Sequence, residues 1–264
     1  MAETYIDLSI TSQGVASLTL NRPEVHNAFD DVMIEQIIDA LQQLADDPSV
    51  RLLVLKASGK NFSAGADLNW MRSMAEKDYQ QNLDDAGRLA ELMRLLDVFP
   101  KPTMAIVQGA AFGGAVGLVA CCDIAIADPK ASFCLSEVKI GLIPAVISPY
   151  VMRAIGERAS RRYFITAERF FADEAHRLGL VHQITGSDSL DDSAQQLTKQ
   201  LLQNSPAAVA AAKTLIANVS QQAIAEPVIT TTTEAIAQIR VSAEGQEGLT
   251  AFLTKRSPNW LPKD

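Results

Sequence analysis

The chain has 264 residues, 48% of them hydrophobic, and a formal net charge of −8 at pH 7. This length and composition suffice for one large domain or for one domain with an appendage, while the acidic balance predicts no extended basic surface and therefore no nucleic-acid partner. The sequence has no apolar run long enough to cross a membrane, and Met1–Thr4 lacks a basic segment followed by an apolar one, so we expect a cytoplasmic protein without a membrane partner.

The N-terminal segment predicts a β-hairpin followed by a helix. Residues 3–10 and 15–21 alternate loosely between apolar and polar side chains on either side of a Ser-Gln-Gly turn. From residue 34 to residue 45, apolar side chains recur at the helical period, and Asp30 or Asp31 stands where an N-cap is expected. This pattern predicts a helix that follows the hairpin directly.

A strand, a glycine-bearing loop and a helix start follow one another twice along the chain. The first set is the apolar run 51–56, the loop 58–67 and a helix from about Leu68; the second is the run 103–107, a glycine-rich turn and a helix of small residues over 114–121. Short apolar runs of this kind are typical of buried parallel strands. A chain that winds successive β-β-α turns shows this order, and two such turns can place their loops side by side.

The segment between these two sets predicts mostly helix. Residues 69–82 indicate a helix or a mobile loop, and residues 82–99 a second long helix closed by two prolines. The side chains of Trp70, Met71 and Met74 could line an apolar pocket, although such a stripe at helical spacing is more often plain packing. Both interpretations stay open on the sequence alone.

The second half of the chain changes from mixed structure to helices. Residues 156–162 predict a helix with a basic face, which is usually solvated and less often contacts a phosphate. Residues 172–179 predict a helix stopped by glycine, followed by a strand over 180–184. Strand signals then disappear, and the remaining helices are expected near 189–204, 206–221, 225–242 and 244–255, with a doubtful boundary at the threonine run 230–233.

Neither the cysteines nor the histidines are spaced for a disulfide framework or a metal site. The three cysteines, Cys121, Cys122 and Cys134, include an adjacent pair and no C-x-x-C spacing, so we expect buried small side chains. The three histidines form no H-x-x-x-H pair and no cluster with cysteine. We therefore predict that the protein binds no metal.

The glycine-rich turn before the small-residue helix could bind an anion or a developing oxyanion. Gly109, Gly113, Gly114 and Gly117 permit backbone angles and close approaches that a side chain would prevent. The first amides of a helix have no partner within the helix and favour negative charge. Close packing of the helix against a sheet explains the turn equally well, and the glycine spacing does not match the dinucleotide-binding fingerprint.

Glu137 is the candidate group for proton transfer. It stands among apolar residues in Leu-Ser-Glu-Val, ahead of Gly141 and Pro144. A lone glutamate in such a setting is often an exposed residue on an alternating strand. If it is buried beside an anion-binding turn, however, its charged form is disfavoured and its pKa rises, which suits a proton donor or acceptor.

Segments spread over nearly the whole chain resemble the crotonase superfamily, also called the enoyl-CoA hydratase/isomerase family. They are Leu20–Pro23 with Asn27–Ala28, Ser63–Leu68, Val107–Gly109 with Phe112–Gly114, Cys122–Ile124, Ser136–Glu137 with Gly141–Pro144, Ala175 with Leu178–Val181, and Phe252–Arg256. The resemblance implies an α/β fold in which a crotonase-type spiral of repeated β-β-α units carries the acyl-CoA site over residues 1–190. A helical C-terminal region over residues 191–264 would then form a homotrimer, or a hexamer made of two trimers.

The same resemblance implies a site for an acyl-CoA thioester. The amides of Ala66 and Gly114 would form an oxyanion hole for the thioester carbonyl, and Glu137 would move a proton at Cα. The matching substrate-binding and coenzyme A-binding positions are Ala64, Gly65, Asp67, Leu68, Gly113, Phe252 and Lys255. The last two would reach the site of a neighbouring subunit. Coenzyme A is part of the substrate, so no separate cofactor is implied.

The chain departs from the usual two-glutamate hydratase at Gly117, which matches the first glutamate position and has no side chain. Glu137 alone would then take a proton from water and return one to Cα, or a carboxylate of the substrate would assist. A single glutamate at this second position also resembles Δ3,Δ2-enoyl-CoA isomerases. The leading hypothesis is an enoyl-CoA hydratase; the alternatives are such an isomerase, a non-catalytic acyl-CoA binder, or an RNA binder, which the acidic charge disfavours.

The acyl group is suggested by resemblance alone. Residues 114–118, 121–124, 134–138 and 144–149 look like those of bacterial hydratases that act on 3-methylglutaconyl-CoA or on its longer isohexenylglutaconyl-CoA analogue. Both acyl groups carry a β-branch and a distal carboxylate. The resemblance therefore implies a β-branched enoyl-CoA whose own carboxylate could assist the reaction.

Overall fold

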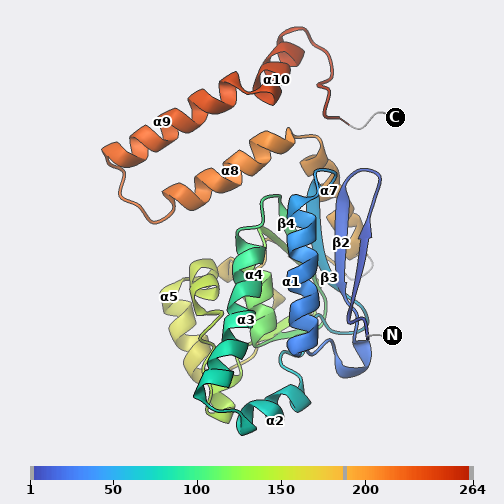
Figure 1. Ribbon diagram of the computed structural model, residues 1–264, viewed down its shortest axis with the longest axis vertical. Helices are drawn as coiled ribbons and strands as arrows, with labels where there is room; N and C mark the ends of the chain where they lie inside the picture. Colours follow the sequence, from blue (N-terminus) through green and yellow to red (C-terminus); the bar gives the residue numbers. More distant parts are fainter. Residues whose placement is uncertain (1–2, 187–188, 262–264) are drawn as a thin grey trace.

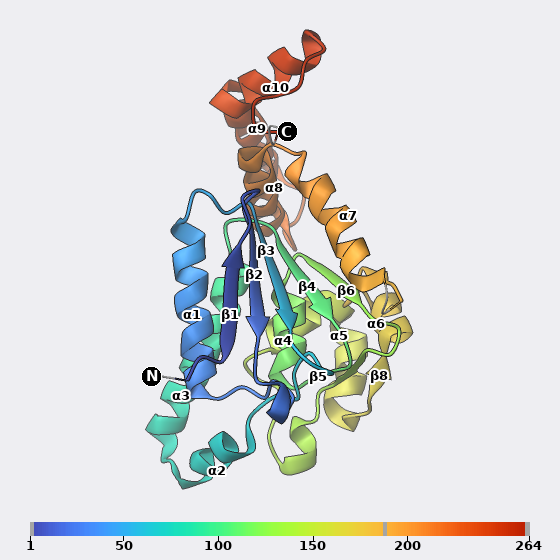
Figure 2. The same cartoon turned by 90° about the vertical axis from the view of Figure 1, so that its right-hand side faces the viewer.

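A six-stranded sheet forms the centre of the computed structural model, which describes residues 3–186 and 189–261 (Figures 1 and 2). In the order β1, β2, β3, β4, β6, β9, the first two strands are antiparallel and the other neighbours are parallel. The antiparallel pair confirms the predicted hairpin. The strands are β1 (Ile6–Ile10), β2 (Val15–Leu20), β3 (Leu52–Ala57), β4 (Thr103–Val107), β6 (Ile124–Ala127) and β9 (Gln183–Ile184).

A smaller sheet continues the chain after two of the main strands. β5 (Ala110–Phe112) follows β4 after a short turn, β7 (Ser132–Cys134) follows β6, and β8 (Phe170–Phe171) pairs with β7. β5 and β7 are parallel, whereas β8 is antiparallel to β7. β4, β5 and the helix after them therefore form one of the strand-strand-helix turns that the sequence order predicted.

Helices cover both faces of the main sheet (Figure 2). Alternate side chains of β3 show the division, because Leu53 and Leu55 join the larger core while Leu52 and Val54 pack with helix α7. The larger core is shared by α1 (Asp31–Asp46), α3 (Tyr79–Asp97), α4 (Gly114–Cys121) and α5 (Ser148–Thr166), and the opposite face is covered by α7 (Leu190–Leu202).

Short helical segments fill the connections. They are η1 (Pro23–Val25), α2 (Leu68–Glu76), η2 (Glu137–Ile140) and α6 (Ala172–Leu178), where η denotes a 3-10 helix. The strand expected over 180–184 is shorter than predicted. The amides of Leu180 and Val181 donate to the Ala175 carbonyl and close α6, so only Gln183 and Ile184 join the sheet.

Helix α5 begins earlier than the sequence predicted. Helical structure starts at Ser148, and Pro149 lies in the first turn, where a helix needs no amide donor. Gly156 has φ 78° and ψ 158°, so it joins two helical segments at a kink. The prediction of a helix over 156–162 is therefore right for the second segment, and the first segment was missed.

The last helices leave the sheet and extend away from it (Figure 1). α8 (Pro206–Val219), α9 (Glu226–Val241) and α10 (Ala243–Leu253) pack on one another, and we call residues 206–253 the helical arm. Within the described chain, α8 and α9 have no buried residue. The threonine run lies inside α9, so the doubtful boundary there does not exist. Large exposed apolar side chains of the arm are Ile216, Ile224, Ile229, Ile236, Val241, Leu249, Phe252 and Leu253.

By its packing, α7 is part of the core and not of the arm. Leu190 and Ala194 lie against the main sheet, although the predicted division assigns residues 191–264 to the C-terminal region. Arg51 donates to the carbonyls of Leu202 and Asn204, at 2.8 and 3.1 Å, where the chain turns from α7 into the arm. This packing favours a boundary after α7, and the division itself remains a proposal.

No helix within residues 3–186 and 189–261 is both long enough and apolar enough to cross a membrane. The expectation drawn from the N-terminal sequence falls partly on Met1 and Ala2, which lie outside the described residues.

Candidate active site

Backbone hydrogen bonds hold the two predicted loops side by side. The Ser63 amide donates to the Ala110 carbonyl at 2.9 Å, and the Phe112 amide donates back to Ser63 at 3.0 Å. An isolated bridge between Ser63 and Ala111 continues this pairing. The loop after β3 is thus attached to β5 of the smaller sheet, and the start of α2 lies near the start of α4.

The amides of Asp67 and Gly113 donate hydrogen bonds within the described part of the protein, whereas the neighbouring amides of Ala66 and Gly114 do not. The Asp67 and Gly113 amides each donate to a backbone carbonyl, at 2.9 and 2.8 Å. Gly114 is the first residue of α4, where an amide has no acceptor within the helix. Across the described residues, neither the Ala66 amide nor the Gly114 amide donates to a protein acceptor. Both can therefore donate to an oxygen atom of a ligand.

A cavity of about 840 Å³ lies beside the two free amides. Most of the predicted site positions line it, and the remaining ones, Asp67, Phe252 and Lys255, do not. The predicted residues that the cavity brings together are Ala64, Gly65, Ala66, Leu68, Gly113, Gly114 and Glu137.

Two glycines are required by the geometry around the cavity. Gly65 has φ 92°, and a Cβ there would lie 2.9 Å from the Phe112 carbonyl oxygen. Gly113 has φ 53°, and its Cβ would lie 3.2 Å from Glu137 Oε1. Both backbone angles disfavour a side chain, and the spaces are already filled. The glycine at 113 thus lets the Glu137 carboxyl approach the N-terminus of α4.

Glu137 begins η2 and is half-buried, with its carboxyl next to Gly113. Its Oε2 atom is buried and has no hydrogen-bond partner among the described residues. Burial raises the pKa of this carboxyl above its ordinary value, and a hydrogen bond from its own backbone amide opposes the shift. A carboxyl of this kind can hold a proton more readily than an exposed glutamate and can pass it to a bound molecule.

The rest of the cavity wall is largely apolar. Trp70, Met71 and Met74 of α2 line it, and Trp70 and Met74 also pack with the larger core, so both interpretations of this stripe hold. The opposite part of the wall was not identified from the sequence, because it comes from the proline-containing run after η2, which gave no periodic signal. It comprises Leu142, Ile143, Pro144, Ala145, Val146 and Ile147.

The side chain of Ile147 fills the space beside Gly117. A Cβ at Gly117 would lie 2.3 Å from Ile147 Cγ2 and 2.8 Å from Ile147 Cβ, with the Met93 sulfur at 3.1 Å. Gly117 and Ile147 are both buried, and Ile147 lines the cavity. The matching family position therefore lacks a carboxylate and has no room for one, and an apolar wall stands in its place.

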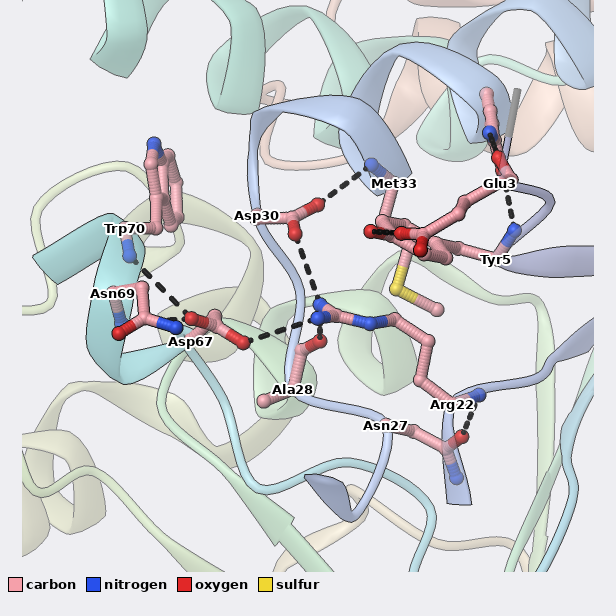
Figure 3. Close-up of polar contacts among 11 residues, drawn as sticks. Glu3, Tyr5, Arg22, Asn27, Ala28, Asp30, Met33, Asp67, Asn69 and Trp70 are labelled. Atoms are coloured by element: carbon pink, nitrogen blue, oxygen red, sulfur yellow. Dashed lines mark hydrogen bonds and ion pairs between the residues drawn. The ribbon is translucent and has the colours of Figure 1, made fainter. Parts of the chain in front are cut away.

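Asp67 does not line the cavity, and its side chain points to Arg22 and to the start of α2 (Figure 3). Its carboxylate accepts from the amides of Asn69 and Trp70, at 2.7 and 3.4 Å, and so caps α2. The other carboxylate oxygen lies 3.2 Å from the Arg22 guanidinium. The Asp67 carboxylate is thus engaged in capping α2 and in pairing with Arg22, and the contact of Asp67 with the ligand stays a prediction.

Phe252 and Lys255 lie at the end of the helical arm, and the fold does not bring them to the cavity of their own chain. Phe252 is 82% exposed. Neither residue can complete the site unless another copy of the chain supplies it.

The three cysteines do not line this cavity. Cys121, Cys122 and Cys134 are buried free thiols, and burial raises the pKa of Cys122 to about 12. Thiols held neutral in this way are poor nucleophiles. Over residues 3–186 and 189–261, no group of three or more His, Cys, Asp or Glu side chains is arranged to hold a metal ion.

Comparison with known proteins identifies the family. The profile described as "Enoyl-CoA hydratase/isomerase" matches residues 10–263. The crystal structure of an enoyl-CoA hydratase from Shewanella pealeana ATCC 700345 superposes with a TM-score of 0.95; it is 55% identical, and the match covers 97% of this chain and 96% of that chain.

Two proteins of Escherichia coli (strain K12) resemble the chain over nearly their whole lengths. A 2,3-dehydroadipyl-CoA hydratase is 32% identical over 94% of this chain and 95% of its own. A 1,2-epoxyphenylacetyl-CoA isomerase is 31% identical over 97% of this chain and 98% of its own. The predicted α/β crotonase fold is confirmed, and the chain belongs to the enoyl-CoA hydratase/isomerase family of enzymes, the crotonase superfamily.

Proposed function

We propose that the protein adds water across the Cα=Cβ bond of an enoyl-CoA, with Glu137 as the proton-transferring group. The observation that carries this proposal is the position of one half-buried carboxyl, with an unpartnered Oε2, in the same cavity as two free backbone amides. A thioester carbonyl held by the amides of Ala66 and Gly114 gains negative charge as the double bond is attacked. Fixed amide donors stabilise that charge strongly in a site shielded from water.

A single carboxyl can perform both proton transfers of the hydration. Glu137 takes a proton from the attacking water as the oxygen bonds to Cβ, and the same carboxyl returns a proton to Cα as the enolate collapses. Its raised pKa supports this exchange, because the protonated form is more accessible than in an exposed glutamate. No second carboxylate at position 117 is needed for the balance of protons.

The second candidate function is the Δ3,Δ2-isomerisation of an enoyl-CoA. The observation that favours it is the Ile147 side chain, which places an apolar wall where a two-glutamate hydratase would hold its water. In that reaction Glu137 would only carry a proton between two carbons of the acyl chain. One of the family relatives named above is likewise an isomerase of an acyl-CoA.

We further propose that the acyl group is β-branched and ends in a carboxylate, as in 3-methylglutaconyl-CoA. Two groups at the cavity support a polar acyl end: the Trp70 indole Nε1, which is buried without a hydrogen-bond partner among the described residues, and the Lys139 ammonium, which has no ion-pair partner among them. A hydrogen-bond donor or a cation can each receive a carboxylate. A relative whose name specifies a dehydroadipyl-CoA substrate acts on an acyl group of the same dicarboxylic kind.

Product analysis tests these proposals. Purified protein is incubated separately with crotonyl-CoA, 3-methylcrotonyl-CoA and 3-methylglutaconyl-CoA, while the enoyl thioester absorbance and the product mass are followed. We expect a product one water heavier, formed fastest from 3-methylglutaconyl-CoA, whereas 3-methylcrotonyl-CoA differs only in lacking the carboxylate. A 3-enoyl-CoA converted without mass change would instead establish the isomerase. Saturable binding with no turnover of any of these thioesters would leave a non-catalytic acyl-CoA binder.

We also propose that the helical arm joins copies of the chain into a homotrimer or a hexamer. The exposed apolar side chains of α8, α9 and α10 support this proposal, since they form a layer that the single chain does not cover. Phe252 and Lys255 would then reach a neighbour's cavity. Light scattering should give a mass three or six times 28.5 kDa, and a monomer at micromolar concentration would contradict the proposal.

A further inference from the structure

Arg22 and Phe29 belong to the surroundings of the Ala66 and Gly114 amides, but neither takes part in the proton transfers proposed above. The Arg22 side chain is 12% exposed and points at three acceptors, two of them within residues 28–30 and the third at Asp67 (Figure 3). Its Nη1 donates to the Ala28 carbonyl at 2.8 Å and to Asp30 at 3.0 Å, and its Nη2 donates to Asp67 at 3.2 Å. The guanidinium also lies 4.2 Å from the centre of the Tyr5 ring.

These contacts fix both sides of Phe29 and the residue after Ala66. The Ala28 carbonyl and the Asp30 carboxylate flank Phe29 in the sequence, so the guanidinium holds the short segment 28–30 at two points. The Asp30 carboxylate also caps α1 through the Met33 amide at 2.9 Å. Arg22 therefore joins the N-terminus of α1 to that of α2, whose cap is Asp67.

Phe29, in turn, contacts the backbone at both oxyanion donors. Its amide donates to the Gly65 carbonyl and its carbonyl accepts from the Asp67 amide, both at 2.9 Å, so that Ala66 is held between these two bonds. Its ring packs over Gly114, where a Cβ would lie 2.6 Å from Phe29 Cζ. Phe29 is 4% exposed, and its ring centre lies 6.5 Å from that of Trp70 in α2.

We propose that Arg22, acting through Phe29, is a positioning residue that sets the separation and direction of the Ala66 and Gly114 amides. The inference rests on the proposed function of these amides as an oxyanion hole. Arginine suits the task because its planar fork reaches several acceptors in fixed directions, whereas the ammonium of lysine is a point charge on a flexible stem. Small displacements of catalytic donors have large effects, and an error near 1 Å can cost about 100-fold in rate.

The test uses Arg22→Met, which removes the guanidinium, and Arg22→Lys, which keeps the charge but not the fork. The matched control is Lys101→Met: Lys101 donates to the carbonyls of Leu44, Ala45 and Asp47 at the opposite end of α1. Each protein is titrated with cinnamoyl-CoA, whose absorption moves to longer wavelength when its thioester carbonyl accepts hydrogen bonds. Turnover of the preferred enoyl-CoA and thermal melting are measured alongside.

We expect the wild type and Lys101→Met to shift the absorption of bound cinnamoyl-CoA fully. Both Arg22 variants should lose most of the shift and lower kcat by about 10- to 100-fold, with KM changed little. A full shift and a kcat within twofold of wild type in Arg22→Lys would overturn the proposal, whatever happens to the melting temperature, and this variant decides the matter if Arg22→Met does not fold. Failure of the proposed function has a different signature, because the wild type itself would then show no shift and no turnover.

Discussion

Replacing Glu137 by glutamine is expected to lower kcat by about 100- to 10,000-fold, the range over which general acid and base groups contribute. Glutamine has nearly the same shape but cannot take a proton from water or return one to Cα. The cavity wall and the free amides stay in place, so the affinity for the acyl-CoA should change only a few-fold. Initial rates and thioester titration of the variant check both expectations. Unchanged turnover would eliminate Glu137 as the proton-transferring group.

The control is Glu157→Gln, which alters an exposed glutamate that pairs with Arg161 at 3.7 Å, and it should leave kcat unchanged. The pH profile gives a second check on the wild type. Hydration needs ionised Glu137, so kcat/KM should fall as the pH drops through a pKa that burial has raised above the ordinary glutamate value of about 4.3.

Glu137→Gln should raise the stability of the protein at neutral pH although it lowers the activity. A carboxyl whose pKa is raised by folding makes the native state less stable as the pH rises from its unfolded pKa through its folded pKa. The glutamine variant avoids this loss, so it should melt at a higher temperature than the wild type at neutral pH. Below about pH 4, where both side chains are neutral, the difference should vanish.

Local signals in the sequence were sufficient for the elements that carry the site. The repeated order of strand, glycine-bearing loop and helix indicated that the two loops can lie side by side, and hydrogen bonds between Ser63, Ala110 and Phe112 show that they do. The glycines were informative because positive φ at Gly65 and Gly113 is a property of the backbone at those positions. Glu137 stood out because it interrupts an apolar run.

Contacts between distant segments were not predictable in the same way. Asp67 was assigned to the ligand, yet its partner is Arg22, 45 residues earlier in the chain, and only the fold brings the two together. Ile147 belongs to a run without helical or strand period, and its contact with Gly117 depends on how the chain turns between η2 and α5. The early start of α5 was missed although Pro149 fits the first turn of a helix, where no amide donor is needed.

Introducing the missing carboxylate by Gly117→Glu is expected to destabilise the protein and to give no gain in hydration. The new Cβ would lie 2.3 Å from Ile147 Cγ2, inside a packed core. Overpacking of this kind costs about 1–3 kcal/mol, and the buried, unpaired carboxylate adds a further penalty. Urea unfolding should show the loss as a lower midpoint with an unchanged slope. A variant as stable as the wild type would mean that Ile147 does not fill this space.

Removing the Ile147 side chain together with Gly117→Glu should recover part of what the single change removes. In Gly117→Glu with Ile147→Gly, both clashing atoms of Ile147 are gone, and the nearest remaining contact is the Met93 sulfur at 3.1 Å, at the end of a flexible side chain. The double variant should recover part of the stability lost by Gly117→Glu, with a coupling of about 0.5–3 kcal/mol in the double-mutant cycle.

The double variant would also face its substrate with two carboxylates, so it should hydrate crotonyl-CoA faster than Ile147→Gly alone. Gly117→Gln with Ile147→Gly is the matched neutral control, because it has the same shape without the charge. If the glutamine and glutamate versions hydrate crotonyl-CoA at equal rates, the second carboxylate contributes nothing in this protein. Lack of room at position 117 would then not be the sole reason why the wild-type reaction depends on Glu137 alone.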